Sequence, residues 1–378
     1  MYADAASAVH HFAKRSFEAN AQPQEGNGQR EAFSQIPQSA LIVFGLSIVL
    51  SILFLTSVRY TLWGIVATLA EVETPDVKYV VKEEKNAKGA DALAEEAVDT
   101  EVTVVKQKPI TSKIKTTVRH LHARAGFASR WRGLALFIVY AVAHAMLSGF
   151  IANLLGAFHF PTMSTVFLAK SVGSVMATIT LARFSTAWVH IVISEPSTKA
   201  WYRRVPGVQS WKNVWAPAAI VDITTRVAFA LPVLCSVALG LDSPAGVQFD
   251  HPAMIAFKAV TCLLLGLLAV VALVIPASVA LVRVQASMLP EEDEAIVPFD
   301  RTFGGKVVPE ILGGSGAIGF VDAWKTFDMA SRARIVKMFF KFIAVEIGLH
   351  LFILAALVAE AFILLRPQHV RQLLGQEL

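Results

Sequence analysis

The stretch ALIVFGLSIVLSILFLTSV, residues 40–58, contains no charged residue. A helix of about 20 mostly apolar residues crosses the roughly 30 Å hydrocarbon core of a bilayer, so this stretch is long enough to span a membrane. Similar stretches recur to the end of the chain. The sequence therefore predicts an all-α, polytopic membrane helical bundle over residues 38–366, with about six transmembrane helices and long cytosolic loops. The predicted spans are about 40–58, 134–155, 163–182, 216–241, 255–281 and 339–365.

The composition of the chain supports a membrane location. Of its 378 residues, 55% are hydrophobic and only 17% are charged, and the mean hydropathy is +0.55. These values are too apolar for a soluble protein of this length. The net charge of +5 lies mostly in the loops, so we expect anionic lipid headgroups as its partner rather than nucleic acid. No cofactor or metal motif is evident.

The distribution of Lys and Arg predicts the orientation of the chain. These residues are concentrated in the long connections 71–133, 195–215 and 283–338, whereas the short connections between the spans carry none. The positive-inside rule places the basic connections in the cytosol and both termini on the non-cytosolic face. Residues 1–37 are expected to form a flexible polar tail, and residues 367–378 a C-terminal tail.

The third span has ambiguous limits, because the apolar stretch Met163–Ile193 is too long for one perpendicular crossing. An early crossing at 163–182 places Lys170 in the membrane, whereas a late crossing places Arg183 there. We favour the early crossing, with Arg183–Ser194 continuing as an interfacial helix that carries Trp188.

The second half of the first long connection, Lys106–Arg132, has eight basic residues and no acid. Each Lys or Arg near an anionic leaflet contributes about 1 kcal/mol, so this segment could lie on the membrane as a basic surface. The alternative is ordinary flanking charge beside a span. The candidate headgroup contacts are Lys106, Lys108, Lys113, Lys115, Arg119, Arg124, Arg130 and Arg132.

Ionisable residues at bilayer depth are costly and therefore mark candidate sites. On the sixth span, Glu346 and His350 are one helical turn apart. A carboxylate beside an imidazole could carry a proton or bind a cation; alternatively, both groups hold helices together. The full set of candidate polar residues is Tyr140, His144, Arg183, Asp222, Arg226, Glu346, His350 and Glu360.

Small residues recur on the second predicted span at the spacing of helix contacts, namely Ala141, Ala145, Ser148 and Ala152. Such a stripe lets a second helix approach closely. The partner could be another helix of this chain or a second copy of the protein.

Three segments carry a resemblance to a known family: SEPSTKAWYRRVP from Ser194, IVPFDRTFGGKVVPE from Ile296 and AWKTFDMASRARIVKMF from Ala323. They resemble an uncharacterised family of fungal polytopic integral membrane proteins, some of which are labelled ubiquitin carrier protein. The sequence does not support that label, because ubiquitin conjugation needs a cysteine reachable from the cytosol, and both Cys235 and Cys262 fall within predicted spans.

Three classes of function stay open. The favoured one is a non-enzymatic membrane organiser or subunit of a membrane complex, whose basic loops contact anionic lipid. The alternative is a proton- or cation-coupled transporter or channel that uses the polar stripe of the sixth helix. No inverted repeat supports the common transporter folds. Less support exists for an intramembrane lipid enzyme with His144, His350 and Glu346 as acid and base, because no nucleophile or metal cluster accompanies them.

Overall fold

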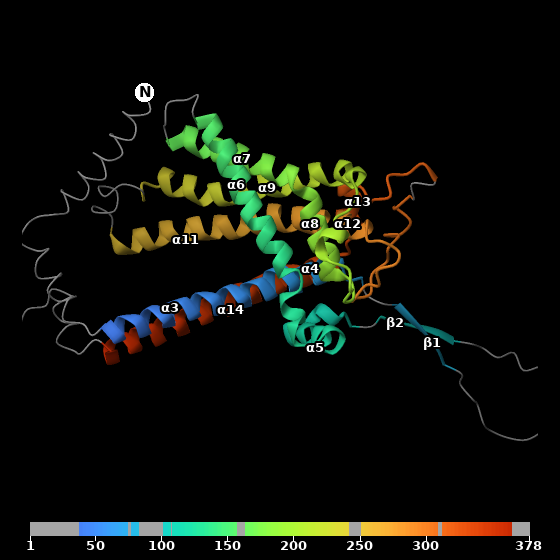
Figure 1. Ribbon diagram of the computed structural model, residues 1–378, viewed down its shortest axis with the longest axis horizontal. Helices are drawn as coiled ribbons and strands as arrows, with labels where there is room; N and C mark the ends of the chain where they lie inside the picture. The colour runs from blue at the N-terminus through green and yellow to red at the C-terminus, as the bar shows by residue number, and fades with distance from the viewer. Residues whose placement is uncertain are drawn as a thin grey trace, which may run out of the picture. The chain divides into compact units, whose positions relative to one another are not determined.

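The computed structural model describes residues 38–74, 77–82, 101–106, 108–156, 163–241, 251–308 and 312–364. The predicted tails, 1–37 and 367–378, lie outside these ranges. The described chain is almost entirely helical (Figure 1), and several of its helices are apolar and long, which confirms the predicted all-α membrane class. A small addition to that class is an antiparallel strand pair, β1 (Val77–Lys82) and β2 (Glu101–Lys106), with Val77 opposite Lys106.

The helices begin and end as follows. The π-helical segments are η1 (Tyr60–Val66) and η5 (Val270–Val274), and the 3-10 segments are η2 (Ile110–Ser112), η3 (Phe127–Trp131) and η4 (Trp201–Arg204). The α-helices are α3 (Gln38–Arg59), α4 (Ala67–Val72), α5 (Ile114–Ala125), α6 (Leu134–Gly156), α7 (Met163–Thr180), α8 (Ala182–Ile193), α9 (Val208–Ala238), α11 (Pro252–Ala269), α12 (Ile275–Ser287), α13 (Phe320–Lys325) and α14 (Met329–Leu364).

Several helices are long and apolar enough to cross a membrane, which indicates an integral membrane location. The described residues contain five of them, and a sixth span results if the bent pair α7 and α8 is one crossing, with a 60° bend at its break. The five are Gln38–Val72, Phe127–Gly156, Val208–Ala238, Pro252–Ser287 and Met329–Ile363. These helices are longer than the apolar stretches of the sequence. Their helical turns continue into amphipathic segments, which a search for apolar stretches does not include.

The chain forms two compact units. The first consists of Met1–Arg59 and Ile343–Leu378, and the second of Tyr60–Phe342. In the first unit, the Ser47 hydroxyl donates a hydrogen bond of 2.7 Å to the Glu360 carboxylate and so links α3 to α14. The division falls where α3 gives way to the π-helical turns of η1.

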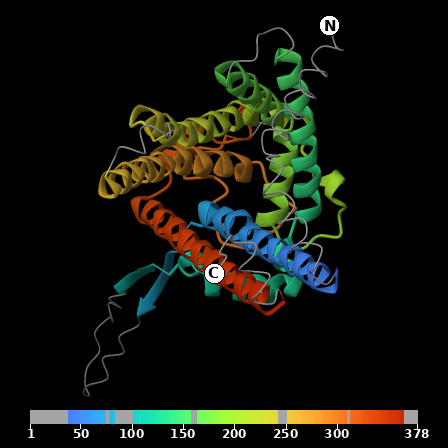
Figure 2. The same ribbon diagram turned by 90° about the vertical axis from the view of Figure 1, so that its left-hand side faces the viewer.

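In the second unit, α6 packs on α7, α7 on α9, and α9 on α11 (Figure 2). Helices α6 and α7 approach closely at Gly173: a Cβ atom at this position would lie 2.5 Å from the carbonyl oxygen of Ser148 and 3.3 Å from the Cβ of Ala152. These two residues belong to the predicted stripe of small side chains. At this point the stripe packs against a helix of the same chain.

The hydrophobic core of the second unit lies largely in the predicted loops, the predicted interfacial helix and the residues beside them. We call these segments, residues 60–74, 108–133, 182–207 and 283–342, the connecting layer. Its core joins side chains from several of them, including Leu69, Leu121, Val192, Ile296 and Ala323.

Helix α8 differs from the expected interfacial helix. Its residues Val189, Val192 and Ile193 are buried in the core of the connecting layer, and the indole of Trp188 donates to the Tyr60 hydroxyl at 3.0 Å. The apolar face of α8 therefore packs on protein. The reason is that α4 and α12 contact this helix, and their positions follow from tertiary packing that a hydropathy pattern does not contain.

We predict that Gly173→Ala lowers the free energy of unfolding by about 1–3 kcal/mol, because the added methyl group meets backbone that has little room to move. Thermal unfolding in detergent measures the loss. Gly149→Ala on α6 is the matched control, since a Cβ there meets nothing within 4 Å. Equal melting temperatures for the two variants would contradict the close contact.

Candidate functional site

The carboxylate of Glu73, just after α4, fixes the position of η2. It accepts hydrogen bonds from the backbone N–H of Ile110 at 2.6 Å and of Thr111 at 3.0 Å, and a third from the Thr111 hydroxyl. Glu73 is only 1% exposed. A buried carboxylate is tolerated where charge-assisted donors surround it, so Glu73 binds the segment around residue 110 to the end of α4.

Arg334 of α14 adds a cation to the same point. Its guanidinium lies 3.6 Å from the Glu73 carboxylate and donates to the backbone carbonyls of Ala70, at 3.3 Å, and Glu73, at 3.1 Å. The Ser331 hydroxyl is a further acceptor at 3.3 Å. Three segments of the connecting layer, α4, η2 and the first turns of α14, therefore meet at one ion pair.

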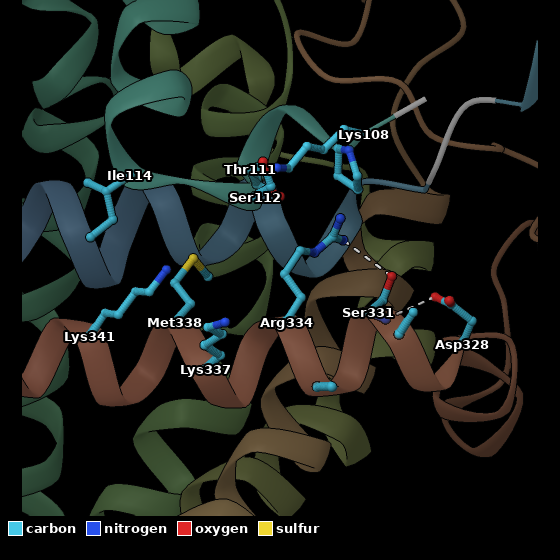
Figure 3. A pocket seen from close by; sticks show the side chains of 13 residues that line it. Lys108, Thr111, Ser112, Ile114, Asp328, Ser331, Arg334, Lys337, Met338 and Lys341 are labelled. Atoms are coloured by element: carbon cyan, nitrogen blue, oxygen red, sulfur yellow. Dashed lines mark hydrogen bonds between the residues drawn. The ribbon is translucent and has the colours of Figure 1, made fainter. Parts of the chain in front are cut away.

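A groove of about 510 Å³ lies between η2 and α5 on one side and α14 on the other. Figure 3 shows Arg334, Met338 and Lys341 extending from α14 toward the segment that carries Thr111 and Ile114. The groove is lined by Lys108, Pro109, Thr111, Ser112, Ile114, Asp328, Ala330, Ser331, Ala333, Arg334, Lys337, Met338 and Lys341.

The groove has an excess of positive charge. Lys108, Lys337 and Lys341 are exposed, and within the described ranges none of these ammonium groups forms an ion pair. The charge of Arg334 is balanced by Glu73. The one acid of the lining, Asp328, accepts a bond of 3.3 Å from the backbone N–H of Ser331. Three lysines facing one acid leave the groove able to bind an anion.

The groove lies where α14 changes from charged to apolar. Lys341 is the last Lys or Arg before Arg366, and the intervening residues are mostly apolar. Ile114 and Met338 add apolar surface to the lining. Lysine side chains place apolar stems against such surface while their ammonium groups stay in water, a combination that suits a phosphate group at the surface of a bilayer.

The eight predicted headgroup residues separate in the structure. Lys108 lines the groove, and Lys113, Lys115 and Arg119 are exposed on or beside α5. The side chain of Lys106 lies outside the described part of the chain.

The remaining three predicted contacts are engaged within the protein. Arg124 donates to Glu195 at 2.6 Å, and the guanidinium of Arg130 lies 5.1 Å from the centre of the Phe127 ring. Arg132 donates to the carbonyl oxygens of Ile191, at 2.9 Å, and Ser194. Arg132 therefore stabilises the end of α8, a role that differs from the expected headgroup contact and arises because the last carbonyls of a helix need donors.

Polar candidates within the second unit meet in the helix contacts of α6, α7 and α9. His144 shares a hydrogen bond of 3.0 Å with Thr178 of α7, and Tyr140 lies 5.8 Å from the His144 ring centre. Asp222 pairs with Arg226 at 2.8 Å and accepts from Ser174 at 3.2 Å. The bonds of His144 to Thr178 and of Ser174 to Asp222 join neighbouring helices, whereas Asp222 and Arg226 pair within α9.

Arg183 does not share that cluster. Its guanidinium donates twice to the carbonyl oxygen of Pro206, at 2.9 and 2.6 Å. In the first unit, Nδ1 of His350 lies 2.7 Å from the backbone oxygen of Glu346, and Glu360 accepts from Ser47. Glu346, His350 and Glu360, the predicted polar stripe of the sixth span, therefore all belong to the first unit.

Apart from Lys108, the charged residues that build the groove are not among the predicted headgroup contacts. Arg334, Lys337 and Lys341 follow the spacing of one helix face, a signal visible in the amphipathic stretch before the sixth span. Glu73 carries no such signal, because its role depends on donors about 37 residues further along the chain.

Comparison with protein-family models, curated proteins and solved structures finds no match to this chain. The resemblance to a fungal membrane family therefore stays a prediction.

We predict that Glu73→Ala lowers the free energy of unfolding by about 3 kcal/mol, because it leaves a buried guanidinium and two backbone donors without their carboxylate. Glu292→Ala removes an exposed carboxylate and should change the value by less than about 0.5 kcal/mol. Thermal unfolding of both variants measures the difference, and similar melting temperatures would show that Glu73 does not hold the layer together.

Proposed function

We propose that this protein is a non-enzymatic membrane organiser, or a subunit of a membrane complex, that binds an anionic lipid headgroup in the groove between η2 and α14. The observation that supports this most is the cluster of Lys108, Lys337 and Lys341 beside an apolar helix, with no compensating ion pair in the described ranges. Lipid held at this point would order the protein relative to the membrane surface. The proposal extends to a membrane partner or a second copy of the chain.

The groove has a defined shape, and this distinguishes a lipid-binding site from ordinary basic residues that flank a membrane span. Glu73 and Arg334 hold its two sides together through buried hydrogen bonds. A site of defined shape selects a lipid headgroup by geometry, whereas scattered surface lysines attract any anion. Its volume of about 510 Å³ lies in the ordinary range of small-molecule sites.

The transporter alternative has weaker support. Its candidate groups in the second unit, Asp222 and Arg226, neutralise each other at 2.8 Å. Both residues belong to α9, one turn apart, so their charges balance within that helix without any transported ion.

We predict that the double variant Lys337→Gln/Lys341→Gln binds anionic lipid about 30-fold more weakly. The expectation follows from about 1 kcal/mol for each lysine near an anionic surface, because about 1.4 kcal/mol corresponds to tenfold in affinity. Titration of detergent-purified protein with phosphatidylserine, followed by native mass spectrometry, counts the bound lipids.

The matched control is Lys212→Gln/Lys325→Gln, which removes the same charge from two exposed lysines outside the groove. It should bind as the wild type does. Equal losses in both double variants would contradict a defined site and favour flanking charge.

We also propose that the connecting layer faces the cytosol and that both termini lie on the opposite side, since the basic residues gather in this layer. A peptide tag placed before α3 should then be protected from protease added to the cytosolic side of sealed vesicles, whereas a tag inserted at Gly304–Gly305 should be cleaved. The reverse pattern would contradict the orientation.

A further inference from the structure

A second cavity, lined by residues of the connecting layer and of η5 and α12, differs in chemistry from the basic groove. It has a volume of about 150 Å³ and lies between η1 and α4, η5 and α12, and the first turns of α14. Glu71 and Ser278 provide its polar side chains, and the Ser278 hydroxyl donates to the Glu71 carboxylate at 2.9 Å. Among the described residues that line it, none is Lys, Arg or His.

The carboxylate of Glu71 is therefore buried without a neighbouring cation in the lining. Glu71 is 7% exposed. Burying an ionised carboxylate is costly unless an opposite charge or several donors compensate for it, and the cavity offers the hydroxyl of Ser278. A cationic ligand would supply the missing charge.

Part of the lining of the cavity is aromatic. The ring centre of Trp63 lies 5.5 Å from that of Phe339 and 5.2 Å from that of Phe342, with interplanar angles of 78° and 75°. All three side chains line the cavity. Aromatic faces attract cations through their quadrupole, and aromatic walls beside a carboxylate are a recurring way to bind methylated ammonium groups.

We propose that this cavity binds a quaternary ammonium group, with Glu71 as its counter-ion and Trp63, Phe339 and Phe342 as its aromatic wall. The lining also explains why a methylated cation fits better than a primary one. A primary ammonium has three N–H donors that need acceptors, whereas a trimethylammonium group has none and prefers apolar and aromatic contact. A metal ion is disfavoured, because the described residues contain no group of three His, Cys, Asp or Glu side chains that could hold one.

Size and backbone geometry agree with this ligand. A cavity of about 150 Å³ in another protein admits benzene, and the van der Waals volume of a tetramethylammonium ion is similar to that of benzene. Trp63 belongs to η1, and Val270 and Val274 belong to η5. Both π-helical segments of the described chain therefore line this cavity, and π-helical turns occur frequently at functional sites.

The source of the ammonium group is either a free small molecule or a choline lipid headgroup. Met338 lines both this cavity and the basic groove, so a zwitterionic headgroup could place its phosphate near the lysines and its trimethylammonium beside Glu71. The site itself does not depend on anionic-lipid binding, and its test uses a cation alone.

The test titrates purified protein, in a detergent without a choline headgroup, with tetramethylammonium chloride and follows the melting temperature. Sodium chloride at equal concentration is the salt control. We expect tetramethylammonium to raise the melting temperature above this control and methylammonium to raise it less. No difference between tetramethylammonium and sodium in the wild type would overturn the proposal.

Two variants test whether the rise in melting temperature with tetramethylammonium arises from binding in this cavity. Glu71→Gln keeps the shape of the side chain and should bind tetramethylammonium at least tenfold more weakly, while Glu292→Gln should bind it as the wild type does. If Glu71→Gln does not fold, Ala67→Leu, which fills the cavity from α4, must abolish the stabilisation. Wild-type affinity in the folded Glu71→Gln protein, or in Ala67→Leu, would overturn the assignment.

Free choline and a soluble short-chain phosphatidylcholine then separate the two sources. Tighter binding of the phosphatidylcholine, lost in Lys337→Gln/Lys341→Gln but with choline binding retained, supports a lipid headgroup. Equal binding of both compounds supports a free ammonium compound at the same site.

Discussion

The ion pair between Glu73 and Arg334 is the interaction on which the connecting layer depends. Its carboxylate satisfies the backbone donors of Ile110 and Thr111, and its guanidinium satisfies carbonyls at the end of α4. Pairs of this kind are seldom a large net source of stability, because desolvation offsets most of the attraction. Their main effect is to specify which segments pack together, because any other packing of these segments leaves a buried charge without its partner.

Other arginine side chains also join separate segments of the connecting layer. Arg283 donates to the Ala323 carbonyl at 3.0 Å and lies 4.7 Å from the Phe303 ring centre, and Arg204 pairs with Asp293 at 3.0 Å. Irregular backbone between helices exposes carbonyl groups that need donors, and the planar guanidinium provides several at once. Several arginines of the basic connections therefore form hydrogen bonds within the protein. The lysines that line the groove are exposed instead.

Sequence reasoning predicts the helical membrane class well, because a charge-free stretch such as residues 40–58 has one physical explanation. It also places the end of the third span at residue 182, close to Thr180, where α7 ends. It cannot predict that α8 is buried or that Arg132 bonds the end of that helix, since both depend on contacts between distant segments. Glu71 and Glu73 show the limit most clearly: two residues apart, one faces an aromatic cavity and the other an arginine, and nothing in their local sequence separates them.

A lipid site in the groove can be located by photo-crosslinking of the purified protein with an anionic lipid that carries a photoreactive group in its headgroup, followed by peptide mapping. Modified residues should concentrate in Lys108–Ile114 and Arg334–Lys341, which line the two sides of the groove. Crosslinks spread evenly over the basic residues of the connecting layer, or confined to helix ends away from it, would contradict a defined lipid site.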